Sequence, residues 1–180
     1  MSAPGPNHSE LLLKHAWLVL LHVSRIPPHV GLMIDGNYNS LTIKGQELNV
    51  SCEALLKTIQ IKKTDAVFLQ LKKHPVFSNG HLLDVFQHQV QQFPHVKQGV
   101  ATCVQPLKLF FHEFYALQKT DDELLFELVK RLEDNDYIGE RIFVNIDEKS
   151  MKNGKFSLPD YSAEQLQEVI REKRSAYYKD

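Results

Sequence analysis

Residues 29–45 read HVGLMIDGNYNSLTIKG, and this stretch predicts a β-hairpin. Apolar residues recur with period two on both sides of a central turn, at Val30, Leu32, Ile34, Leu41 and Ile43. That period is typical of strands. The turn, Asp35-Gly36-Asn37, holds residue types that tolerate the positive φ of a tight hairpin. We therefore expect two antiparallel strands here.

The stretch before the hairpin is more ambiguous. Residues 11–23 are almost continuously apolar and stop before Pro27-Pro28. Such a run fits a buried helix or, from Trp17 onward, a buried strand, and periodicity alone does not decide between them. The two prolines end the element because proline lacks a backbone donor and restricts the residue before it.

The chain after the hairpin predicts mostly helices. Ser51 can cap a short helix over 52–59, and residues 66–71 form a buried strand. Helices are expected at 80–93, 102–117, 121–133 and 162–178, with a strand at 141–146. Adjacent antiparallel strands followed by helices favour an α+β fold, a small antiparallel sheet packed against helices. We divide the chain into a disordered lead (1–7), a core domain (8–146) and a C-terminal loop and helix (147–180).

Composition narrows the classes of function. The chain has 180 residues and a formal net charge of −1, which is not the basic footprint of a nucleic-acid binder. The apolar stretch 16–21 is far shorter than the roughly 20 residues that span a bilayer. Two cysteines make no disulfide framework and indicate a reducing compartment. We expect a cytoplasmic protein without a membrane span or a cofactor.

Two residues could carry chemistry together. His29 opens the first hairpin strand, and Cys103 stands where the 102–117 helix is expected to begin. A helix N-terminus favours a thiolate, because its free amides and dipole are positive. A histidine within hydrogen-bond reach would take the thiol proton and return it to a leaving group.

Two segments resemble a known family. His29–Gly36 looks like the histidine strand and turn, and Thr102–Phe110 like the cysteine helix, of the circularly permuted papain-like, NlpC-type cysteine hydrolases. This branch includes the PPPDE deSUMOylating peptidases and the lecithin:retinol acyltransferase-like proteins. The resemblance implies a permuted papain-like core and a thiol hydrolase acting on a peptide or acyl-amide substrate, with Cys103 as nucleophile and His29 as base.

The resemblance leaves the third residue of the site open. The acyltransferase-like members carry a second histidine on the returning strand, where this chain offers Asn39, Ser40 and Thr42. Thr42 would lie across from His29 if Asp35-Gly36 forms a two-residue turn. We therefore expect Thr42 to orient the imidazole.

Three alternatives stay open. Cys52 also follows a capping serine and could be the reactive thiol, although it is nearer to His29 than the family order suggests. The chain could instead be a binding or scaffold domain without catalysis. A third possibility is a metal site, because two sets of histidines recur every seven residues: His8, His15, His22 and His29, then His74, His81, His88 and His95. The substrate's bond type and the oligomeric state are not fixed by the sequence.

Overall fold

The computed structural model describes residues 10–118, 120, 123–146, 151–152 and 155–177. The expected lead at 1–7 lies outside them, as do 121–122 and 147–150. After a helical turn at 10–12, the elements are β1 (Ala16–Leu21), β2 (His29–Ile34), β3 (Asn37–Leu41), β4 (Gln46–Ser51), α2 (Cys52–Ile61), β5 (Ala66–Leu71), α3 (Asn79–Gln91), α4 (Gln105–Tyr115), α5 (Leu125–Asp134), β6 (Ile138–Val144), β7 (Met151–Lys152), β8 (Lys155–Phe156) and α6 (Ala163–Tyr177).

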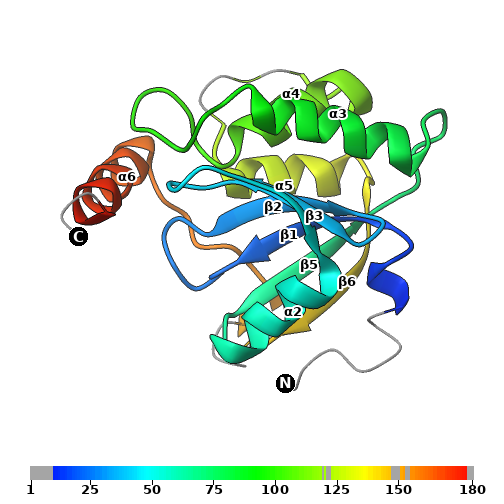
Figure 1. The fold of residues 1–180 in the computed structure, drawn as a ribbon, viewed down its shortest axis with the longest axis horizontal. Helices are drawn as coiled ribbons and strands as arrows, with labels where there is room; N and C mark the ends of the chain where they lie inside the picture. Colours follow the sequence, from blue (N-terminus) through cyan, green and yellow to red (C-terminus); the bar gives the residue numbers. More distant parts are fainter. Residues whose placement is uncertain (1–9, 119, 121–122, 147–150, 153–154, 178–180) are drawn as a thin grey trace.

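The fold is α+β, as the sequence predicts. The main sheet has the order β4-β3-β2-β1-β5-β6, and each pair of neighbours is antiparallel. Helices α3, α4 and α5 cover one face of the sheet, and α2 lies on the other (Figure 1). Helix α6 lies beside the end of the sheet at which β2 begins (Figure 1).

The central strand resolves the ambiguity near the N-terminus. β1 pairs with β2 and β5, and its first five residues are buried. Leu18 and Leu20 face the core under α3–α5, and Trp17 and Val19 face the core under α2. A strand covered on both faces is apolar at every position, so alternation is absent from its sequence.

The predicted hairpin is present with a two-residue turn. Ile34 pairs with Asn37, which leaves Asp35 and Gly36 as the turn residues, with φ of 46° and 77°. Both values lie in the left-handed region that a type I′ turn requires. Gly31 allows β3 to pack closely, since a Cβ there would lie 2.6 Å from the carbonyl oxygen of Asn39.

Helix α4 and strand β4 differ from the sequence prediction. Helix α4 begins at Gln105 rather than near residue 102, because Thr102 and Cys103 lie in the turn that leads into it. The Gln105 amide donates to the Thr102 carbonyl, 3.1 Å away. The edge strand β4 was not predicted. Its exposed residues are polar, as is common where a strand meets solvent on one side.

The C-terminal helix is part of the packed structure. Leu166 and Ile170 of α6 are buried in a cluster with Tyr161, Leu41 and Val96. Ser162 caps the helix, since its Oγ accepts from the Gln165 amide at 3.2 Å. Helix α6 therefore covers the end of β3.

Candidate functional site

A pocket of about 540 Å³ lies at the end of the sheet where β2 begins. Its walls come from elements far apart in the chain. Leu55 and Ile59 of α2 line one side, and Leu166 and Ile170 of α6 line another. The loop before α4 contributes Cys103. The pocket therefore reaches from the α2 face of the sheet around to α6.

His29 lies in this pocket at the first position of β2. Its Nε2 is 3.2 Å from Oγ of Ser40 on β3, and that hydroxyl donates to Oε2 of Glu47 on β4 at 2.8 Å. A hydroxyl has one proton, and Ser40 directs it at the carboxylate. Nε2 of His29 must therefore be the donor to Ser40. The imidazole is then the Nε2–H tautomer, with a lone pair on Nδ1.

His29 is held in its neutral form. Burial lowers its pKa to about 4, and the charges of His22 and Lys173 act in the same direction. Desolvation disfavours the protonated imidazole. At neutral pH the ring is therefore an uncharged hydrogen-bond donor to Ser40.

Cys103 also lines the pocket, beside the start of β2, where the Val30 amide bonds its sulfur. Its side chain packs against the core under α3–α5 and against the α6 cluster. His29 shares a face of β2 with Met33, which belongs to the core under α2. No hydrogen bond in the described part of the chain joins the thiol to the imidazole. The two residues line one pocket without forming a preassembled pair.

The Cys103 thiol is protonated at neutral pH. Burial raises its pKa, while the backbone amides of Val30 and Cys103 and the charge of Lys173 partly offset that rise. The thiolate is the nucleophilic form of cysteine. A raised pKa therefore leaves Cys103 less reactive than a free thiol.

The hydroxyl that bonds His29 belongs to Ser40, not to Thr42. Thr42 lines the pocket, but its Oγ1 donates to the Gly45 carbonyl at 2.9 Å and accepts from the amides of Lys44 and Gly45. These three bonds fix the turn between β3 and β4. The orienting role that we expected of Thr42 falls to Ser40 in this geometry. Strand alternation could have identified Ser40, since it faces the same side as His29 across the two-residue turn.

The other candidate residues lie elsewhere. Cys52 is the first residue of α2 and is buried, and its amide donates to the Gly36 carbonyl at 2.7 Å. It packs behind the hairpin and does not line the pocket. Among the described residues no three His, Cys, Asp or Glu side chains gather in a way that could hold a metal ion.

One pocket residue was missed by sequence reasoning. Tyr38 on β3 lines the pocket and is 1% exposed. Its polar neighbour is Ser40, whose hydrogen bond opposes the rise that burial gives to the Tyr38 pKa. Two buried donors, Trp17 Nε1 and Tyr115 OH, lack a partner among the described residues, but neither lines the pocket. No pattern in the sequence marks Tyr38, because tyrosine is an ordinary strand residue.

Comparison of the chain with protein-family models, curated proteins and solved structures finds no match in any of the three. The papain-like resemblance therefore stays a prediction. Within the described residues, no helix combines the length and apolar character needed to cross a bilayer.

Proposed function

We propose that this domain binds a small organic molecule in the pocket between α2, the start of β2 and α6. The observation that carries the proposal is the pocket of about 540 Å³, whose lining combines apolar side chains of α2 and α6 with the polar groups of His29, Thr42 and Lys173. Ligand pockets are typically ~300–1,000 Å³ and mostly apolar, with a few polar groups that fix orientation.

The state of the pocket's two reactive groups favours binding over catalysis. The Cys103 thiol and the His29 imidazole are both neutral at physiological pH, since burial raises the thiol pKa and lowers the imidazole pKa to about 4. No hydrogen bond among the described residues joins the two side chains. A neutral thiol, which donates, and a neutral imidazole, whose Nδ1 accepts, suit recognition of a ligand's polar atoms.

A fluorescent probe tests the proposal. 1-Anilinonaphthalene-8-sulfonate, an aromatic anion, is titrated into the full chain, and we expect saturable binding. Val169 lines the pocket from α6, whereas Glu168 beside it is exposed. Val169→Trp fills the pocket and should weaken binding about tenfold, and Glu168→Trp should leave it unchanged. Equal binding by both variants would place the probe elsewhere and overturn the proposal.

A thiol hydrolase is the second candidate, because the pocket contains both Cys103 and His29. Cys103 Sγ would attack an acyl carbon and pass its proton to His29 Nδ1. The amine or alcohol would leave with that proton, and water would hydrolyse the resulting thioester. The amides of Val30 and Cys103, which approach the sulfur, would stabilise the thiolate. This route requires the imidazole to turn toward Cys103. The rate at which the Cys103 thiol reacts with iodoacetamide tests whether the route operates.

A further inference from the structure

The pocket has an excess of positive charge. Three lysines line it, Lys44, Lys62 and Lys173, against a single carboxylate, Glu47. Glu47 accepts a hydrogen bond from Ser40, which stabilises its charge. The Lys44 ammonium lies over the Tyr177 ring, 5.6 Å from its centroid. Lys62 and Lys173 have no ion-pair partner among the described residues.

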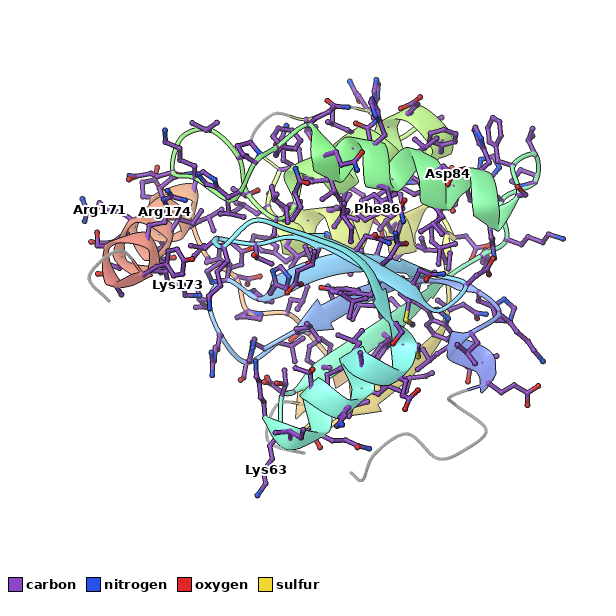
Figure 2. The ribbon with its side chains drawn as sticks, in the orientation of Figure 1. Lys63, Asp84, Phe86, Arg171, Lys173 and Arg174 are labelled. Carbon is purple, nitrogen blue, oxygen red and sulfur yellow. The ribbon has the colours of Figure 1, made fainter. Side chains whose placement is uncertain are left out.

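Among the three lysines, Lys173 is the one whose charge acts on His29 and Cys103. It projects from the side of α6 that faces the sheet, whereas Arg171 lies on the outer side of the same helix (Figure 2). Desolvation lowers the pKa of His22 and His29, and the charge of Lys173 adds to this lowering in both. The same charge acts on the Cys103 thiol. The charge of Lys173 thus affects the pKa of three side chains of the pocket.

The remainder of the lining is apolar. Helix α2 contributes Leu55 and Ile59, and α6 contributes Leu166, Val169 and Ile170. The apolar part of a ligand would bury surface against these side chains at roughly 25 cal/mol per Å². A small inorganic anion would leave this wall unused, and a purely apolar molecule would leave Lys173 without a counter-charge.

We propose that the ligand is an amphipathic organic anion, of the medium-chain carboxylate class, whose charged group pairs with Lys173 and whose chain lies between α2 and α6. This inference rests on the proposed function, because it names the class of molecule that the same pocket takes. The Lys173 ammonium group supplies the donors for the carboxylate, whose two oxygens accept hydrogen bonds.

Calorimetry with three ligands of equal chain length tests the inference. Decanoate, decanol and decyltrimethylammonium are titrated below their aggregation concentrations into the full chain. We expect decanoate to bind most tightly and its affinity to fall with added salt, because an ion pair open to solvent is screened. Decanol should bind about tenfold more weakly, since it lacks the charge.

Two variants of α6 provide the matched comparison. Lys173→Gln should reduce decanoate affinity about tenfold and leave decanol affinity unchanged. Arg171→Gln removes the same charge from the outer side of the helix and should change neither. Urea unfolding of both variants shows whether they fold as the wild-type chain does, and the comparison of the three ligands in the wild type stands without them.

The outcomes separate this inference from the proposed function. If decanol or the ammonium ligand binds as tightly as decanoate, the inference is wrong but the pocket is still a binding site. The inference is also wrong, and the pocket is still a binding site, if none of the three ligands binds while Val169→Trp weakens binding of the anilinonaphthalene probe. If the probe also binds equally to Val169→Trp and Glu168→Trp, the proposed function itself is overturned.

Discussion

Nε2 of His29 and Oγ of Ser40 lie 3.2 Å apart, joining β2 to β3 beside the pocket that His29 lines. Ser40 donates its own hydrogen bond to Glu47, so the three side chains form one hydrogen-bonded chain across three strands. The direction of these bonds makes Nε2 the donor, and burial, which lowers the pKa of His29 to about 4, keeps the imidazole neutral. The stability of the fold should therefore depend on the charge of His29.

Acid should destabilise the protein through His29. Its pKa is about 4 in the folded chain and about 6.5 when unfolded, so the unfolded state binds the proton first as pH falls. The contribution of neutral His29 to the free energy of unfolding is fully present above pH 6.5. It is lost as the pH falls from 6.5 to 4, and the loss is roughly 3 kcal/mol at most. Lowered pKa values of His22 and Asp65 act in the same direction.

His29→Gln tests this assignment. Glutamine keeps a donor toward Ser40 but does not titrate, so the free energy of unfolding in urea should depend less on pH between 7 and 4.5 than in wild type. His88→Gln, on the exposed side of α3, is the control and should keep the wild-type dependence. Equal slopes for wild type and His29→Gln would contradict a buried neutral imidazole.

Cys103 should react slowly with iodoacetamide at neutral pH. The raised pKa leaves less thiolate than a free cysteine has, so the rate at pH 7 should be about tenfold lower and should rise beyond pH 9. The experiment uses a Cys52→Ser background, and Cys103→Ser gives the blank. A fast reaction that is already constant between pH 5 and 7 would instead favour the thiol hydrolase.

The same thiol can report the charge of the pocket. Methanethiosulfonates of opposite charge react with Cys103 in the same way: each transfers its own alkylthio group to form a mixed disulfide and releases methanesulfinate. The sulfonatoethyl reagent should react faster than the trimethylammonioethyl reagent by about tenfold at low salt, because the lysines attract anions. Lys173→Gln should remove most of that preference and Arg171→Gln little of it. A preference for the cationic reagent would contradict the charge assigned to the pocket.

Gly31→Ala should destabilise the sheet. The added Cβ would lie 2.5 Å from Cε2 of Tyr38 and 2.6 Å from the carbonyl oxygen of Asn39, so backbone must move. The cost is about 2 kcal/mol, measurable by urea unfolding. Gly80→Ala on α3 meets no atom within 4 Å and should be neutral or stabilise by about 0.5–1 kcal/mol. An unchanged stability for Gly31→Ala would show that the Tyr38 ring is not confined there.

Local patterns in the sequence predict much of the fold. The hairpin, its two-residue turn and the capping serines of α2 and α6 depend on residues near one another in the chain, and each is present. The strand β4 was missed because its outward residues, Gln46, Glu47 and Asn49, carry no apolar alternation on that side. The start of α4 was misplaced because the Thr102–Gln105 turn resembles a helix in sequence.

The site was less predictable than the fold. His29 and Cys103 were correctly expected at a strand start and near a helix start, and both line the pocket. How the Cys103 turn lies relative to His29 depends on how α4 and α6 pack against the sheet, and no local pattern encodes this. Tyr38 belongs to the pocket because of how its strand is buried, and Lys173 because α6 packs against strands far earlier in the chain. Only the folded chain therefore identifies these two residues.

The walls of the pocket come from segments as distant as Leu21 and Lys173. The cavity consequently exists only when the whole chain has folded, and an unfolded or partly folded chain has no binding site for a ligand. Any molecule that occupies it must raise the melting temperature in proportion to the logarithm of its concentration above saturation. A thermal-shift screen of metabolite extracts could thus reveal the natural occupant, whatever its chemistry.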